Sequence, residues 1–170
     1  MRKYLVIFIF FLFLFSCKQD KPADIEVEEM TQIAEELSQT FTERIPQMTD
    51  ELKVKIYELQ ERIKIEPENI DLRKQFCETA YSAENMVMLT MGLSRMTNPE
   101  TGEKISRGMV ERAAQIDATR WALFATNWLM YDYQPAFTEI KGNFTRKTQV
   151  LDKVVVGDSL FLYLASDLSQ

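Results

Sequence analysis

The chain contains no histidine, and it has only two cysteines among its 170 residues. Without an imidazole it cannot build a Ser-His-Asp triad, a histidine general base or a histidine metal site. Once Cys17 is modified, as argued below, Cys77 is the only remaining thiol, which excludes an internal disulfide. Because Cys77 directly follows Phe76 in a helical pattern, we interpret it as a small buried apolar residue.

Glycine is also scarce, and the five glycines are scattered singly, so the sequence contains no phosphate-binding loop. Basic residues are outnumbered, 20 against 26 acidic ones, which gives a net charge of −6. Nucleic acids and anionic lipids both require a basic surface. The composition therefore argues against a nucleic-acid partner, and no motif indicates a cofactor. Met86, Met88 and Met91 could suggest a soft-metal site, but we interpret them as core residues.

The N-terminal residues have the layout of an export signal. Arg2 and Lys3 are followed by twelve apolar residues, 4–15, and then by Ser16. A positive segment, an apolar stretch and a small residue, in this order, are typical of a secretory signal. As a helix, twelve residues would extend about 18 Å against about 30 Å of bilayer hydrocarbon, which is too short for a transmembrane anchor. We therefore predict that residues 1–16 are a cleaved signal peptide.

The residues Leu14-Phe15-Ser16-Cys17 resemble the lipobox of bacterial lipoproteins. The resemblance implies cleavage before Cys17 and attachment of a diacylglyceryl group to its sulfur. An ordinary cleavable signal with a chance cysteine is the alternative. Two acyl chains provide stable anchoring to a membrane without a transmembrane helix. Removal of Arg2 and Lys3 leaves 18 basic and 26 acidic residues, a net charge of −8 for the mature chain.

The residue after the cysteine is Lys18, not an aspartate. By analogy with the sorting of envelope lipoproteins, this favours the outer membrane, and the face of that membrane stays open. The expected partners are the membrane itself, through the lipid on Cys17, and an envelope protein.

Residues 17–24 are predicted to be a polar tether, and residues 25–81 a helical region. A first helix ends near Pro46. A second begins after Thr49 and stops at Pro67, and a third begins after Asn69, because Thr and Asn side chains cap helix N-termini. Three apolar stripes with spacings of three and four predict these helices: Val27, Met30, Ala34, Leu37 and Phe41; Leu52, Ile56, Leu59 and Ile63; and Leu72, Phe76 and Ala80.

The pattern changes after Tyr81, and we predict an α+β domain over residues 82–170. Residues 85–92 are short and continuously apolar, which favours a buried strand closed by Gly92. Residues 98–102 form a loop, and residues 106–131 a long helix that a sheet covers. That helix presents one apolar stripe with alanines beside it for close packing: Val110, Ala114, Asp117, Trp121, Phe124 and Trp128, flanked by Ala118, Ala122 and Ala125.

Residues 144–164 carry the clearest strand signal. Alternation along the first half predicts two opposite faces, one with Val150, Asp152, Val154 and Val156, the other with Leu151, Lys153 and Val155. Gly157-Asp158 then precedes the apolar run 159–164, and a glycine-first pair is typical of a hairpin with a type II′ turn. The expected fold is an arm of two to three helices, a strand, a long helix and a C-terminal hairpin, with a small antiparallel sheet packed on the helix.

Asp117 is the candidate site residue, because an acid on a covered apolar stripe must be hydrogen-bonded or ion-paired. Arg120, one helical turn later, and Lys153 of the hairpin are its candidate partners. We interpret Asp117 and Arg120 as a buried polar anchor that specifies the fold, and a ligand site is the alternative. No catalytic residues and no metal ligands are predicted.

A resemblance to a known family rests on three segments: residues 113–120 (Ala-Ala-Gln-Ile-Asp-Ala-Thr-Arg), Ile140-Lys-Gly142, and residues 150–158. On these segments, residues 85–168 resemble the Lpp-twenty family of small bacterial lipoproteins, named for a twenty-kilodalton member. The single Gly92 and the aromatic-rich segment 128–137 depart from the family pattern. The resemblance implies an envelope lipoprotein with an α+β domain, and it implies no catalytic residues.

The leading functional hypothesis is a non-catalytic, lipid-anchored envelope protein that binds a protein partner or supports the envelope. The alternative is an all-helical, tetratricopeptide-like adaptor, because Glu66-Pro67-Glu68-Asn69 resembles the turn between the helices of such a repeat. A hydrolase is a third hypothesis, and it would need two carboxylates that converge in one cleft.

Overall fold

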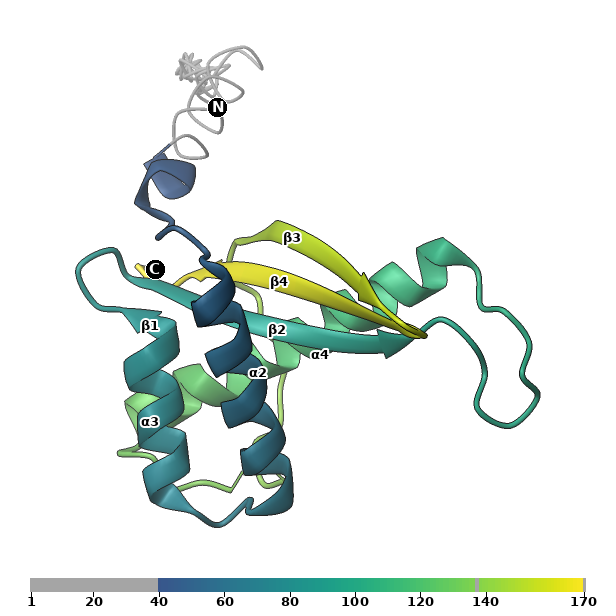
Figure 1. Ribbon diagram of the computed structural model, residues 1–170. Coiled ribbons are helices and arrows are strands. Elements are labelled where there is room, and N and C mark those ends of the chain that lie inside the picture. The colour runs from purple at the N-terminus through teal and green to yellow at the C-terminus, as the bar shows by residue number, and fades with distance from the viewer. Residues whose placement is uncertain (1–39, 137, 170) are drawn as a thin grey trace, which may run out of the picture. The chain divides into compact units, whose positions relative to one another are not determined.

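The computed structural model describes residues 40–136 and 138–169, which belong to one compact unit, Leu37–Gln170 (Figure 1). The predicted signal peptide, Cys17, the tether and the part of the first helix before residue 40 lie outside the described residues. The description begins in a helix that extends to Arg44, so this helix ends before Pro46 as expected. Phe41, the last residue of its predicted stripe, is fully buried.

Two helices follow and form a hairpin, α2 (Asp50–Ile65) and α3 (Ile70–Ala80). Both predicted caps are confirmed. Thr49 accepts a hydrogen bond from the Leu52 amide at 3.2 Å, and Asn69 accepts one from the Leu72 amide at 3.3 Å. Each cap satisfies a backbone donor that has no partner within its own helix.

The sheet has four antiparallel strands in the order β1-β2-β4-β3: β1 (Tyr81–Ser82), β2 (Val87–Arg95), β3 (Thr148–Val156) and β4 (Ser159–Asp167). This confirms the α+β fold with a C-terminal hairpin, and the all-helical alternative is wrong. Gly157 has φ of +60°, while Asp158 has no positive φ, as a type II′ turn requires. The strand β1 has only two residues, too few for any periodic pattern, and sequence reasoning missed it.

Helix α4 (Arg107–Met130) packs on one face of the sheet, and α2 packs on the other. In Figure 1, α4 passes behind the strands and α2 in front of them. On the α2 side, the ring of Tyr57 meets that of Phe161 with 5.6 Å between centroids. The α4 side is a cluster of small and branched residues: Val110, Ala114, Ala118, Leu160, Leu162 and Leu164. Strand β4 is apolar at six consecutive positions, 160–165, because both of its faces are covered.

The contact between α4 and β2 is unusually close. Thr90 Oγ1 donates a hydrogen bond of 3.0 Å to the carbonyl of Ala118, across the two elements. A Cβ atom added to Gly92 would lie 1.8 Å from the Ala114 carbonyl oxygen. The predicted role of the alanines is confirmed, since Ala118, Ala122 and Ala125 are all fully buried.

The predicted faces of β3 need one correction. The register shifts between Val150 and Asp152, which leaves Leu151 in a bulge. Side chains alternate between the two faces of a strand. One extra residue therefore moves every side chain on one side of the bulge to the opposite face of the sheet. Val150 consequently packs with the α4-side cluster, whereas Val154 and Leu151 pack on the α2 side. Val150 and Leu151 were therefore both assigned to the wrong face.

The larger core joins the helical hairpin to the sheet and α4. Phe76 of α3 lies against Trp121 and Trp128 of α4, with ring centroids 5.7 and 6.1 Å apart. The expected division at residue 82 does not separate two cores, because α3 completes the core that covers the aromatic face of α4.

One buried cation, Arg73, ties the helical hairpin to the segment after α4. Its Nη1 donates to the carbonyls of Tyr133 at 2.7 Å and Gln134 at 2.9 Å, and its Nε donates to Pro67 at 3.1 Å. The side chain is only 1% exposed, and carbonyl acceptors compensate the cost of burying its charge. Sequence reasoning did not single out Arg73, because a lone arginine in a helix carries no pattern.

Candidate functional site

Asp117 is half-buried, and it ties α4 to the end of β2. Its Oδ2 accepts a hydrogen bond of 3.1 Å from the backbone amide of Leu93. Neither expected cation pairs with it within residues 40–136 and 138–169. Lys153 Nζ lies 2.7 Å from Glu111 Oε2, and Arg120 is exposed. Asp117 thus acts as a polar anchor through a backbone donor, and not through the ion pair with Arg120 that the sequence suggested.

This geometry lowers the expected cost of losing the Asp117 carboxylate. Asp117→Ala should reduce the free energy of unfolding by about 1–2 kcal/mol, the scale of one hydrogen bond to a charged group at a half-buried position. Asp117→Asn should cost less, because an amide oxygen still accepts from Leu93. Urea unfolding measures both changes. A loss of about 3–5 kcal/mol for Ala, the cost of breaking a buried ion pair, would contradict the arrangement described here.

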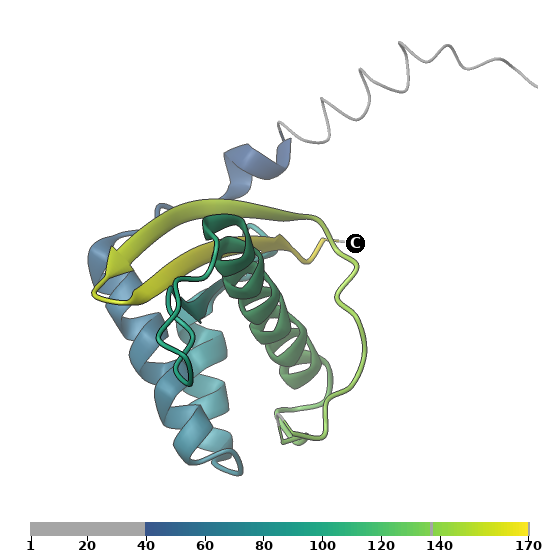
Figure 2. The ribbon, with the colours of Figure 1, turned by 90° about the vertical axis from the view of Figure 1, so that its right-hand side faces the viewer.

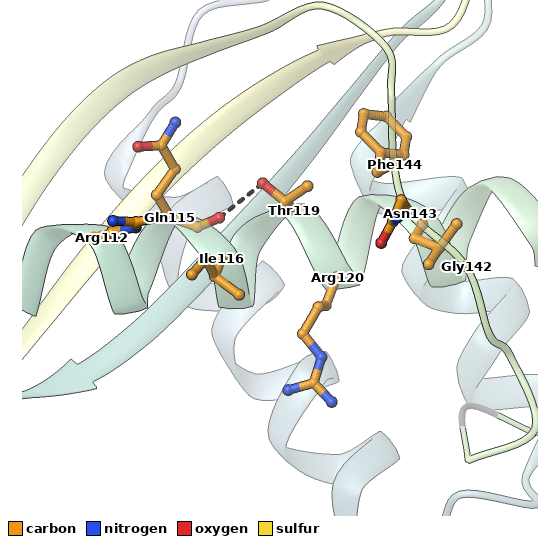
Figure 3. Close-up of a pocket in the computed structure, with 9 residues that line it drawn as sticks. Arg112, Gln115, Ile116, Thr119, Arg120, Gly142, Asn143 and Phe144 are labelled. Carbon is orange, nitrogen blue, oxygen red and sulfur yellow. Dashed lines mark hydrogen bonds between the residues drawn. The ribbon is translucent and has the colours of Figure 1, made fainter.

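A groove runs along the outer side of α4. Figure 2 shows the chain after α4 returning beside that helix before it enters β3. Between the helix and this returning segment lie three adjoining hollows, and the first has a volume of about 470 Å³. Figure 3 shows Ile116 and Arg120 on the helix, with Asn143 and Phe144 on the returning segment. We call the combined hollows the α4 groove.

An apolar residue occurs at every seventh position on this outer side: Met109, Ile116, Leu123 and Met130. The exposed fractions of Met109, Ile116 and Met130 are 66%, 54% and 63%. Leu123 is half-buried, and together with Ile116 it lines the first hollow. Seven residues correspond to almost two helical turns, so the four side chains form one stripe along the helix. We call this stripe the α4 seam.

The charges around the seam are positive. Arg112 and Arg120 line the first hollow, and Lys141 lines the next two. In the described part of the chain, none of these three cations forms an ion pair or a hydrogen bond through its side chain. The one acid that lines the groove, Glu139, accepts a hydrogen bond of 3.0 Å from the amide of Ala136.

Glu111, the residue before Arg112 on α4, is engaged elsewhere. Glu111 accepts from Lys153 at 2.7 Å and from Arg107 at 2.9 Å. The hydrogen bond from Lys153, followed by the one from Arg107, lowers the pKa of Glu111 below its usual value. Glu111 therefore stays ionised and committed to β3, and it does not neutralise Arg112.

Outside the groove, most of the sulfur-containing side chains that could carry redox or metal chemistry are core residues. Burial raises the pKa of the Cys77 thiol to about 12, so it stays protonated within the core, as the sequence suggested. Met88 and Met91 are core residues as expected, whereas Met86 is exposed and has φ of +53°. Among the described residues no cluster of three or more cysteines and acids is placed to hold a metal ion.

Two carboxylates do line one hollow between α2 and α3. Glu58 and Glu78 share it with Lys55 and Arg62. All four are exposed, so the arrangement lacks the desolvation that adjusts carboxyl groups for acid–base work.

A second electrostatic feature holds the C-terminal end of β4. Arg44 Nη2 lies 2.8 Å from Asp167 Oδ2, and Arg44 Nη1 donates to the carbonyl of Asn85 at 2.7 Å. The Asp167 carboxylate also accepts from the hydroxyl of Ser169 at 2.7 Å and from its amide at 3.0 Å. Burial opposes ionisation of Asp167, but these hydrogen bonds and the arginine outweigh it and lower its pKa.

The lowered pKa of Asp167 predicts a loss of stability in acid. A carboxyl group whose folded pKa lies below its ordinary value of 3.8 stabilises the fold above that pH. This contribution disappears as the pH falls through the folded pKa. Asp167→Asn should therefore flatten the decline in unfolding free energy below about pH 4, as urea titrations at several pH values measure. Asp71→Asn, at an exposed acid on α3, is the control, and an equal flattening for both variants would contradict the assignment.

The groove was not predicted as a site, although its main signal is visible in the sequence. The sevenfold spacing of Met109, Ile116, Leu123 and Met130 can be read directly along residues 106–131. It was overlooked because the inner stripe with the two tryptophans is the stronger pattern. The opposite wall of the groove, at Gly142, Asn143 and Phe144, carries no periodic pattern in the sequence.

In the part of the chain that the structure covers, no helix combines the length and the apolar character needed to cross a bilayer. The comparisons with known proteins name no relative: no family model, no curated protein and no solved structure matches the chain. The resemblance of residues 85–168 to the Lpp-twenty family stays a prediction.

Proposed function

We propose that this chain is a non-catalytic lipoprotein of the cell envelope, anchored in the outer membrane by lipid on Cys17. Its folded unit, residues 37–170, binds a protein partner through the α4 seam and groove. The anchoring part of the proposal rests on the sequence of residues 1–18. The binding part rests on the geometry of α4.

The exposed seam is the observation that carries the binding proposal. Single exposed apolar residues are normal on protein surfaces, but several aligned on one side of one helix beside a groove favour an interaction site. Met109, Ile116 and Met130 are each more than half exposed on one side of a helix whose opposite side is already packed. The sheet, α3 and the segment after α4 cover the inner side of α4, whereas these three side chains stay exposed within the described residues.

The rival hypotheses have less support. A hydrolase needs converging carboxylates in a partly desolvated cleft, and the α4 groove is lined mainly by cations and apolar side chains. Glu58 and Glu78 line a shared hollow but are exposed. We therefore assign no reaction to the chain.

Photo-crosslinking in the native envelope tests the binding proposal. A photoreactive amino acid at Ile116 should give a discrete adduct with one envelope protein. The same residue at Val54, equally exposed on α2, should not give that adduct. Adducts of the same pattern from both positions, or none from position 116, would contradict a partner on α4.

A further inference from the structure

We propose that the α4 seam receives an acidic amphipathic helix of the partner protein. This inference rests on the proposed function and adds the chemistry of the partner. The incoming helix carries an apolar residue at every seventh position. Its flanking carboxylates face the unpaired cations of the groove.

The spacing of the seam specifies a helix. From Met109 to Met130 the seam spans about 31 Å at 1.5 Å per residue, so a partner helix of about 20 residues covers it. Seven residues fall about 20° short of two full turns, so the seam drifts slowly around α4. A second helix that crosses at a shallow angle follows such a drift.

The groove provides a wall for this helix on one side. Phe144 and Asn143 of the returning segment line the first hollow together with Ile116 and Leu123. The half-buried Leu123 marks where the seam is most recessed, and Met109 and Met130 project at its two ends. A rod-shaped ligand along α4 therefore packs against the seam and against Phe144.

The charges specify an acidic partner. Arg112 and Arg120 lie four residues before and after Ile116, so they flank the seam about 40° to either side. From these positions the long arginine side chains reach carboxylates on a helix that lies along the seam. Both arginines lack an ion pair within the described ranges, as does Lys141 at the opposite wall. Carboxylates on the incoming helix supply the missing partners, and matched charges select that partner over others.

A second copy of the chain fits less well. Two α4 seams placed together would bring arginines toward arginines. Glu139 is the one acid that lines the groove, and it accepts from the Ala136 amide, while Glu111 and Asp117 are engaged with β3 and β2. A lipid surface also fits less well. Its binding requires a broad apolar face, and the mature chain, at a net −8, repels anionic lipid.

The test uses the full chain purified from membranes in detergent, with a fluorescent 21-residue helical peptide as the probe. The peptide carries leucine at every seventh position and glutamate at the flanking positions, and a control peptide has lysine in place of glutamate. We expect the acidic peptide to bind and the basic one not to bind. The double variant Arg112→Glu/Arg120→Glu should have an affinity for the acidic peptide that is lower by about tenfold or more, and it should bind the basic peptide. Arg62→Glu, at an exposed arginine of α2, should change the affinity for neither peptide.

Three results of the binding experiments would overturn the inference. These are equal affinity for both peptides, an affinity that the double variant leaves unchanged, or saturable binding of the α4 face to phosphatidylglycerol vesicles without peptide binding. Self-association that the double variant abolishes would assign the seam to a second copy instead. Crosslinks from position 116 that persist in the double variant would leave the proposed function intact while rejecting the acidic helix. Absence of those crosslinks would reject the function itself.

Discussion

Gly92→Ala is expected to destabilise the folded unit severely. The added Cβ would lie 1.8 Å from the Ala114 carbonyl oxygen and 2.5 Å from the Ala118 amide nitrogen. Both atoms belong to the backbone of α4, so no side-chain rotation relieves the overlap. The helix must move away from β2, which breaks the hydrogen bond from Thr90 to Ala118. We expect a loss of about 4 kcal/mol or more, against a total of about 5–15 kcal/mol for a typical domain.

Urea unfolding measures this loss, and α4 itself provides the matched control. Gly108 lies in the first turn of α4, and a Cβ added there would meet no atom within 4 Å. Gly108→Ala should therefore leave stability unchanged or raise it by up to about 1 kcal/mol, because alanine favours helices. A Gly92→Ala midpoint close to that of the unmodified chain would show that strand and helix are not in such close contact.

Cys17→Ser is expected to abolish membrane association completely. The reason is that the apolar stretch 4–15 is too short to span a bilayer, so the acyl chains on Cys17 are the proposed anchor. Without the sulfur, neither the diacylglyceryl transfer nor the cleavage that follows it takes place. Metabolic labelling with a fatty acid and fractionation of the cell measure both effects. Ser16→Ala, which keeps a small residue before the cysteine, should retain the label. A Cys17→Ser variant that still carries label would contradict the assignment.

The helices and the hairpin turn could be predicted because local sequence determines them. Thr49 and Asn69 cap the helices that they were expected to cap, since capping involves residues only three positions apart. Gly157 marks the hairpin turn because only a residue that tolerates a positive φ fits there. The inner stripe of α4 was also readable, because a 24-residue helix gives a periodic pattern many repeats.

The features that escaped prediction depend on contacts between distant segments. The bulge at Leu151 fits an alternating sequence as well as a regular strand does, and only pairing with β4 reveals it. Arg73 binds the carbonyls of Tyr133 and Gln134, 60 and 61 residues later, and no spacing predicts such a contact. Asp117 was expected to need a cation because its burial was inferred from the stripe alone. A free backbone amide at Leu93 satisfies it instead.

The α4 seam could also be predicted only in part from the sequence. The four seam residues are a local pattern, and they were available from the sequence. Their exposure was not, because an apolar stripe on a helix looks the same whether a neighbouring element covers it or not. The groove exists because the chain after α4 returns along that helix and leaves the seam open.

Lipid anchoring at Cys17 is tested by the mass of the N-terminal peptide of the protein isolated from membranes. We expect the chain to begin at Cys17 and this residue to carry the added mass of a diacylglyceryl group. An N-terminus at Met1, or cleavage at another position with an unmodified Cys17, would contradict the assignment as a lipid-anchored envelope protein.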